Sequence, residues 1–193
     1  GLAMGTAMLM DHGFYLYQDI WKDQPPVFSY LLLAIENLFP GNVIAARALV
    51  SLFAVMLLRS LFRIVRRQYG SMAAWAAVLL LGTFPIFPRL AVSVMAGLPA
   101  IALTVITLDI VMGADKPSRI RIIIAAILFG LALQTKLFVL VFAPGLFLAF
   151  ALEKSYGSLV SRGHSALLFG ILVVVTFFAI AWYSQMSILE DTW

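Results

Sequence analysis

The densest group of polar side chains lies in the ten-residue segment 17–26, which ends in a rigid Pro25-Pro26 step. Its polar members are Tyr17, Gln18, Asp19, Lys22, Asp23 and Gln24. Carboxylates serve as bases or hold a cation, and a lysine binds an anion. Polar groups at membrane depth are costly unless they are paired or hydrated, so this segment is a candidate functional site. The alternative is a solvated loop with a chance ion pair between Lys22 and an aspartate.

Three further cations stand in apolar surroundings: Arg47, Arg89 and Lys136. Arg and Lys side chains bind phosphate and stabilise the negative charge that develops when a phosphate leaves. With Lys22, these residues therefore predict an anion-binding site. Arg47 is the strongest of the three, because it lies about one turn inside an apolar stretch, where a charge needs a partner. The alternative for each is snorkelling to the phosphates of membrane lipids.

The composition around these polar residues is that of a membrane protein. Of the 193 residues, 63% are hydrophobic and 11% are charged, whereas a soluble domain has about 45–50% apolar and 25% charged residues. The chain has no cysteine, which excludes disulfides, thiolate zinc sites and thiol nucleophiles. The formal net charge is +4, but no basic run is interleaved with aromatic residues, so nucleic acid is not an expected partner.

The apolar stretches predict about six membrane spans, since one span takes about 20 residues. The predicted spans are 43–62, 72–87, 90–112, 122–133, 137–152 and 166–183. Pro85 and Pro88 mark the turn between the second and third spans, and Pro144 predicts a kink in the fifth. The segment 122–152 crosses either once or twice, because both of its apolar halves are short.

The distribution of Lys and Arg favours two crossings, because cytoplasmic loops collect these residues. The segments 59–71, 113–121 and 153–165 then share the cytoplasmic side. They hold most of the basic residues: Arg59, Arg63, Arg66, Arg67, Lys116, Arg119, Arg121, Lys154 and Arg162. The opposite side holds residues 1–42 and the tail 184–193, which carry most of the acids: Asp11, Asp19, Asp23, Glu36, Glu190 and Asp191.

We therefore predict an all-α fold, a multi-pass transmembrane helix bundle. Residues 43–193 form the bundle as a single membrane domain, and residues 1–42 form the first extracytoplasmic loop. Two apolar helical stretches in this loop, 2–10 and 27–39, are too short to cross the membrane. Gly13 is suited to capping the first of them. Because aromatic residues that favour the headgroup level cluster between them, we expect interfacial helices.

Three other polar residues are weaker candidates. His12 could ligate a metal, but a lone histidine is more often a cap or surface residue. Asp109 lies near the cytoplasmic end of the third predicted span, where a salt bridge or snorkelling is favoured over a proton relay. Glu36 either faces the candidate site or lies on a solvated face, and we favour the solvated face. The sequence contains no phosphate-binding glycine loop, HExxH motif or nucleophile elbow, and any metal ligands remain unknown.

Six motifs follow one another along the chain: Gly13-Phe14-Tyr15-Leu16-Tyr17-Gln18-Asp19, Asp23-Gln24-Pro25-Pro26, Leu38-Phe39-Pro40-Gly41, Ala45-Ala46-Arg47, Gly130-Leu131-Ala132-Leu133-Gln134-Thr135-Lys136 and Ala181-Trp182-Tyr183. Each is weak singly, but their order and spacing resemble the lipid-dependent, multi-pass glycosyltransferases of the GT-C fold. These are relatives of the protein mannosyltransferases and the lipid A aminoarabinose transferases, of glycosyltransferase family 39. The fifth motif resembles the family's GLAxxTK break, and the last resembles its PWY span ending, with alanine in place of proline.

The resemblance implies an acidic motif at the start of the first loop, whose aspartate is the proposed base. It would fall just before Gly1, so we expect the chain to be a fragment. By position, Asp23 matches the family's second loop acid, with Gln24 where many relatives have lysine. This departure puts a phosphate contact at that position in doubt, and Lys22 is the candidate replacement. The family's aspartate after the second span has no counterpart within 94–97.

We therefore expect an inverting membrane glycosyltransferase that moves a sugar from a polyprenyl-phosphate carrier to a lipid, glycan or protein acceptor at the extracytoplasmic face of the plasma membrane. Asp23 and Asp19 are expected to be catalytic, because they assist the base or hold a divalent cation. The residues expected to bind the donor phosphate are Arg47, Lys22, Lys136 and Arg89. Gln24 and Tyr17 are expected to make further contacts from the loop. The alternatives are a fragment of a transporter or channel whose polar loop lines a substrate path, and a membrane scaffold without chemistry.

Overall fold

The computed structural model describes residues 2–113, 118–153 and 156–190, with the side chains of 185–190 excepted. These residues form eight α-helices and one 3₁₀ helix. In chain order they are α1 (Leu2–Asp11), α2 (Val27–Leu38), α3 (Val43–Thr83), α4 (Ile86–Ala91), α5 (Gly97–Met112), α6 (Arg119–Thr135), η1 (Leu137–Phe142), α7 (Ala143–Leu152) and α8 (Leu159–Glu190). The prediction of an all-α fold is confirmed.

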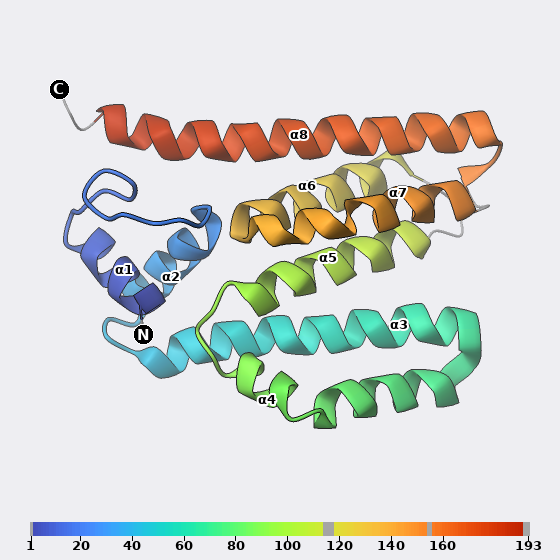
Figure 1. Cartoon of the computed structure of the whole chain (residues 1–193), viewed down its shortest axis with the longest axis horizontal. Coiled ribbons are helices and arrows are strands. Elements are labelled where there is room, and N and C mark those ends of the chain that lie inside the picture. The colour runs from blue at the N-terminus through green and yellow to red at the C-terminus, as the bar shows by residue number, and fades with distance from the viewer. Residues whose placement is uncertain (1, 114–117, 154–155, 191–193) are drawn as a thin grey trace.

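The long helices lie side by side, and successive passes of the chain run in opposite directions (Figure 1). One end of the bundle carries α1, α2, the start of α3, α4 and the junction of α6 with η1. We call this the loop end. The opposite end carries the turn of α3, the end of α5 and the starts of α6 and α8, and we call it the basic end. This alternation brings residues that are far apart in the sequence to the same end of the molecule.

The longest helix, α3, consists of two antiparallel arms. Gly70, with φ +84° and ψ 176°, separates them, and this left-handed φ is one that glycine adopts at little cost. The second arm folds back along the first (Figure 1). The prediction of a basic loop over 59–71 is therefore wrong, because the arginines of this segment lie in the first arm of α3, before the turn at Gly70. Arginine is a good helix former, so the helix continues through them.

The second and third predicted spans also have different bounds. The return arm of α3 ends at Thr83, and the predicted proline turn contains the short helix α4. The prediction of helix from residue 90 is wrong, since α5 starts at Gly97. Pro99 lies in the first turn of α5, where its missing N–H costs no helical hydrogen bond. In the irregular segment between α4 and α5, Ser93 Oγ donates to the Arg89 carbonyl at 2.6 Å. This carbonyl near the end of α4 therefore has a hydrogen-bond donor.

The segment 122–152 reverses direction halfway. Lys136 is extended, with φ −161° and ψ 120°, between the end of α6 and the start of η1, and the following helix runs back along the bundle (Figure 1). The return pass begins as 3₁₀ helix and becomes α-helix at Ala143, next to Pro144. The predicted kink at Pro144 stays a prediction, since the structure shows a change of helix type beside this residue.

The helices carry the apolar surface of a membrane protein. Within the described residues, α3 and the Leu159–Ser184 part of α8 are long and apolar enough to cross a membrane. The apolar helices Gly97–Met112 and Leu137–Leu152 are shorter. Large apolar side chains remain exposed along the sides of the bundle, among them Leu80 at 78% and Phe178 at 64%. Such side chains fit a lipid surround.

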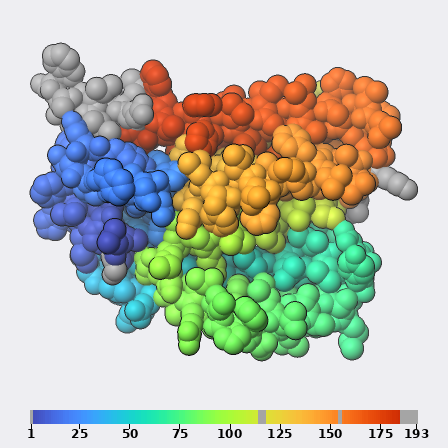
Figure 2. All heavy atoms as spheres, viewed as in Figure 1, coloured from blue at the N-terminus to red at the C-terminus, as the bar shows by residue number. Residues whose placement is uncertain are grey.

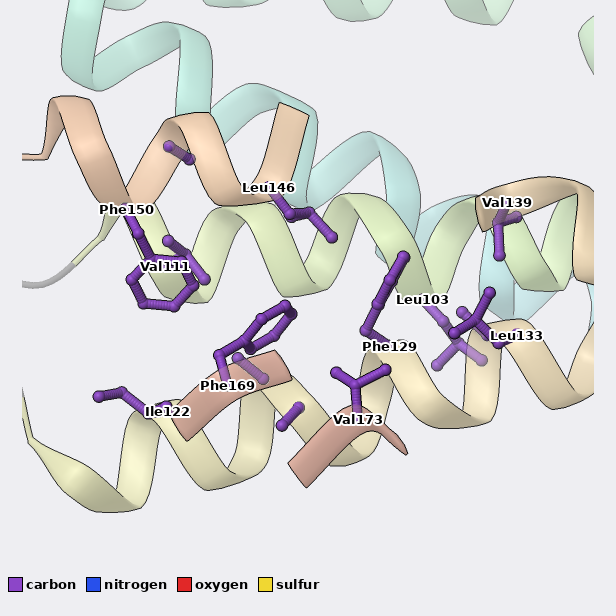
Figure 3. Close-up of a cluster of buried hydrophobic side chains, with 14 of the residues drawn as sticks. Leu103, Val111, Ile122, Phe129, Leu133, Val139, Leu146, Phe150, Phe169 and Val173 are labelled. Atoms are coloured by element: carbon purple, nitrogen blue, oxygen red, sulfur yellow. The ribbon is translucent and has the colours of Figure 1, made fainter. Parts of the chain in front are cut away.

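Two clusters of buried apolar side chains hold the bundle together. In one, aromatic rings from α6, α7 and α8 pack together (Figure 3), and the ring centroids of Phe150 and Phe169 lie 5.2 Å apart. The other joins α1, α2 and the first arm of α3 to α5, through residues such as Met4, Leu32 and Val50. Helix α5 contributes to both clusters, so it is the centre of the bundle.

Helices α1 and α2 form a lobe at the loop end (Figure 2). Gly13 follows α1 with φ +88°, as its predicted capping role requires. Phe28 and Leu32 of α2 are buried in the cluster shared with α3. Helix α3 then begins behind Asn42, whose side chain accepts from the N–H groups of Ile44 and Ala45. The segment before α3 is thereby anchored on the bundle.

Candidate functional site

The polar segment between α1 and α2 is a tight turn fixed by its own backbone. The Tyr17 N–H donates to the Ile20 carbonyl at 2.9 Å, and Tyr17 has a positive φ of 73°. Asp19 Oδ2 accepts from the Tyr15 N–H at 2.8 Å. One oxygen of Asp19 therefore stabilises the turn, although the residue is exposed.

A second bond closes this turn toward α2. The Tyr17 hydroxyl donates to the Gln24 carbonyl at 2.6 Å. Burial, with the neighbouring Tyr30 adding to it, raises the pKa of Tyr17 to about 12, so the hydroxyl keeps its proton. Lys22 and Asp23 lie inside the loop that this bond closes, which limits the positions that they can take.

Lys22 is half-buried against the first turns of α2. Its ammonium donates to Ser29 Oγ, and Ser29 is completely buried. Burial lowers the pKa of Lys22, and the Asp23 carboxylate opposes this shift. Neither loop aspartate forms a salt bridge with Lys22 in the described structure. Lys22 is thus an incompletely compensated cation beside the exposed Asp23.

Lys136 reaches from the junction of α6 and η1 to the first turn of α5. A Cβ placed on Gly97 would lie 4.0 Å from Lys136 Nζ, and the same ammonium lies 5.5 Å from the ring centroid of Phe138. The start of a helix carries a partial positive charge. An ammonium beside it repels that charge unless an anion lies between them, so this arrangement favours binding of an anion.

The residues before Lys136 lock α6 to α8. A Cβ on Gly130 would lie 2.7 Å from Thr176 Cγ2, so only glycine allows this approach of the two helices. Gln134 is 2% exposed, and its Nε2 donates to the Phe177 carbonyl at 2.8 Å. Sequence reasoning identified Lys136 but assigned no role to Gly130 or Gln134. Both position the end of α6, and a glycine and a glutamine inside an apolar stretch were the available signal.

Arg47 and Arg89 lie on elements of the loop end but outside these contacts. Arg47 is exposed on α3, next to the completely buried Ala46. Arg89 is exposed on α4. Neither side chain forms a hydrogen bond or salt bridge with another described residue. The side of α3 that carries Arg47 faces away from the buried stripe, and the binding of a donor phosphate by Arg47 stays a prediction.

Glu36 does not lie on a solvated face, and that prediction is wrong. The residue is only 5% exposed. Its Oε1 accepts from the Gly41 N–H at 2.7 Å, where Gly41 has a φ of +68°. Its Oε2 is buried without a partner in the described structure. Glu36 therefore holds the turn that leads from α2 into α3.

His12 is a cap, as the sequence predicts. Its Nδ1 donates to the Met8 carbonyl at 2.8 Å, at the end of α1. No group of three or more His, Asp or Glu side chains that could hold a metal ion occurs in the part of the chain that the structure describes.

The basic end contains the predicted salt bridge of Asp109. The Asp109 carboxylate is buried and lies 2.8 Å from Arg67 Nη1 and 3.4 Å from Arg63 Nε. These contacts join α3 to α5 at the end opposite Lys136. Among the other predicted cations of this end, Lys116 and Lys154 lie outside the described residues.

Comparison with known proteins identifies a family. A family model described as dolichyl-phosphate-mannose-protein mannosyltransferase matches residues 23–183, which begin at Asp23 and include Lys136. No curated protein and no solved structure gives a significant match.

Proposed function

The chain belongs to the dolichyl-phosphate-mannose-protein mannosyltransferase family, and on that premise we propose that its active face is extracytoplasmic and lies at the loop end. Family membership makes the chain a membrane glycosyltransferase that uses a polyprenyl-phosphate-linked sugar. The observation that carries the proposed location is Lys136 Nζ, held at the first turn of α5. A donor phosphate suits that position because it is anionic and lies at headgroup depth.

The proposed reaction is a direct displacement at the anomeric carbon. The acceptor attacks this carbon from the side opposite the phosphate, and the bond between the carbon and the phosphate oxygen breaks with its electron pair on the phosphate. The configuration is therefore inverted. Lys136 and the start of α5 stabilise the charge that grows on the leaving phosphate. The proton of the acceptor passes to a carboxylate base.

Asp23 and Lys22 have complementary proposed roles at the mouth of the site. Asp23, with Asp19 nearby in sequence, assists the base or holds a divalent cation. Lys22 contacts the donor phosphate in place of the lysine that many relatives have at position 24. Its lowered pKa supports this role, because a poorly compensated ammonium gains most from an approaching anion. Arg47 and Arg89 are proposed to add to the positive potential around the donor.

The proposed topology is a bundle of about six spans, counting each long pass of the chain once. The arginines at the basic end support placing that end in the cytoplasm of a cell whose plasma membrane holds the protein. Residues 1–42 then form an extracytoplasmic unit on the membrane domain 43–193. The acceptor, a lipid, glycan or protein, approaches from the same side as this unit.

The test is transferase activity of the protein in proteoliposomes, with a panel of polyprenyl-phosphate sugars as donors. We expect Asp23→Asn to lower kcat/KM by about 100-fold or more, the range found for general acid–base groups. Asp11→Asn is the matched control, because Asp11 is also exposed in the N-terminal segment but lies outside the proposed site. Full activity of Asp23→Asn would remove Asp23 from the mechanism.

A further inference from the structure

A second cavity lies at the basic end, far along the bundle from Lys136. It has a volume of about 820 Å³ and is formed by the first turns of α6 and α8. Its polar lining consists of Arg119 from α6 and of Ser158, Ser161, His164 and Ser165 at the start of α8. The proposed transferase reaction uses none of these residues.

The lining changes from polar to apolar along both helices. On α6, Arg119 is followed one turn later by Ile122 and Ile123. On α8, the polar residues give way to Leu168 and Leu172, which share a face of the helix with Ser161 and Ser165 because they follow the helical repeat. Val160, in the first turn of α8, is an apolar residue of the outer part. The cavity is thus mainly polar near the end of the bundle and apolar nearer its middle.

The charge that lines this cavity is positive. No carboxylate is among the described lining residues. The neighbouring arginines are occupied: Arg121 donates to the Gly113 carbonyl at 3.0 Å, and Arg162 donates to the Gly157 and Ala151 carbonyls, each at 2.9 Å. Arg119 is exposed and makes no hydrogen bond or salt bridge with the residues that the structure describes. Its guanidinium is therefore available to an anion.

We propose that this cavity binds an anionic phospholipid of the membrane leaflet at the basic end. The lipid phosphate contacts Arg119 and the serine hydroxyls, and an acyl chain lies along Ile123, Leu168 and Leu172. A guanidinium binds phosphate through two parallel hydrogen bonds, which suits the headgroup. A soluble phosphate would use only the polar half of the cavity, whereas a phospholipid matches both halves. The inference depends on the bundle lying in a membrane and not on the proposed transfer reaction.

Native mass spectrometry of the purified protein tests this proposal by titration with phosphatidylglycerol or phosphatidylcholine. We expect phosphatidylglycerol to bind more tightly. Arg119→Gln weakens that binding by about fivefold, the effect of one basic residue near an anionic membrane. It weakens phosphatidylcholine binding less, because the choline ammonium of that lipid already offsets the charge of its phosphate. Arg66→Gln is the matched control, since Arg66 is exposed at the same end but does not line the cavity. Leu168→Gln also weakens phosphatidylglycerol binding.

Three results would overturn the proposal. Equal binding of the two lipids would show that charge is not recognised. Equal losses for Arg119→Gln and Arg66→Gln would assign the binding to the basic end as a whole. Displacement of phosphatidylglycerol by an equal concentration of glycerol 3-phosphate, with no effect of Leu168→Gln, would identify a soluble phosphate ligand. Circular dichroism of each variant shows whether a loss of binding reflects a loss of structure.

Discussion

The two lysines of the proposed site hold their charges in different ways. Lys136 lies between an aromatic ring and the start of α5, so its ammonium is presented at the end of the bundle. Lys22 is half-buried on Ser29, and desolvation lowers its pKa. A bound phosphate would offset the desolvation cost of the Lys22 ammonium. Because its pKa is lowered, Lys22 is the lysine through which pH should affect donor binding.

The first prediction concerns the pH dependence of donor binding. The pKa of Lys22 is lowered from the ordinary lysine value of 10.5. The KM for the donor should therefore begin to rise with pH at a value below 10.5. The reason is that Lys22 loses its proton there while the phosphodiester stays anionic. Lys22→Arg should remove this rise, because arginine stays protonated. Steady-state kinetics of both proteins across pH provide the measurement.

Over the same pH range the folded protein should become more stable while donor binding becomes weaker. The folded chain holds fewer protons on Lys22 than the unfolded chain does, so the free energy of unfolding rises with pH up to about pH 10.5. A rise in KM that simply reflected unfolding would come with a loss of stability. An equal rise in KM for Lys22→Arg would contradict the assigned role.

The sequence identified candidate residues but did not predict their environments. The polar loop and Lys136 stood out because charges are rare in an apolar chain. The burial of Glu36 and the exposure of Arg47 depend on which side of each helix packs against its neighbours. Apolar residues occur on every side of these helices, so the hydrophobic pattern did not distinguish the buried side from the exposed one.

At the scale of elements, one salt-bridge cluster ties two helices together. Asp109 on α5 pairs with Arg63 and Arg67 on α3. Arg67 also donates to the Asp109 backbone carbonyl at 3.1 Å. These salt bridges connect the first arm of α3 to α5, which is the central helix because it belongs to both apolar clusters.

Asp109→Asn should therefore lower the melting temperature of the detergent-solubilised protein. The expected loss in the free energy of unfolding is about 1.5–3 kcal/mol, the range for hydrogen bonds to charged groups. Arg66→Gln is the control, because Arg66 lies on the same helix and makes no hydrogen bond or salt bridge with a described residue. Thermal unfolding followed by circular dichroism measures both. Equal melting temperatures for Asp109→Asn and the unmodified protein would show that the cluster adds no net stability.

Helix boundaries were predictable where a strong local signal marks them. Gly13 and the polar break at Lys136 were such signals, and a helix ends shortly before each of them. Gly70 was not recognised as the turn of α3, because the arginines before it are good helix formers and delay the end of the helix. The start of α5 was missed because residues 92–96 are nearly as apolar as the helix itself.

At the scale of the whole molecule, the proposed topology assigns opposite sides of the membrane to the two ends. The chain has no cysteine, so single cysteines report accessibility without background. We expect a membrane-impermeant maleimide to label Gln18→Cys and Phe138→Cys in intact cells. Gln68→Cys should be labelled only after permeabilisation. All three residues are exposed.

Phe138→Cys is the decisive position for the segment 122–152, because it lies just after the reversal at Lys136. Labelling of Phe138→Cys and Gln68→Cys from the same side would contradict the proposed topology, whereas labelling from opposite sides supports it.

The central claim is that a donor phosphate binds at Lys136, beside the start of α5. The most direct measurement is the dissociation constant of a polyprenyl-phosphate sugar for the protein in nanodiscs. We expect Lys136→Met to weaken binding about tenfold or more, the loss of a charged hydrogen bond, while Arg89→Gln, at an exposed cation outside the contacts of Lys136, has a smaller effect. An unchanged dissociation constant for Lys136→Met would contradict the account.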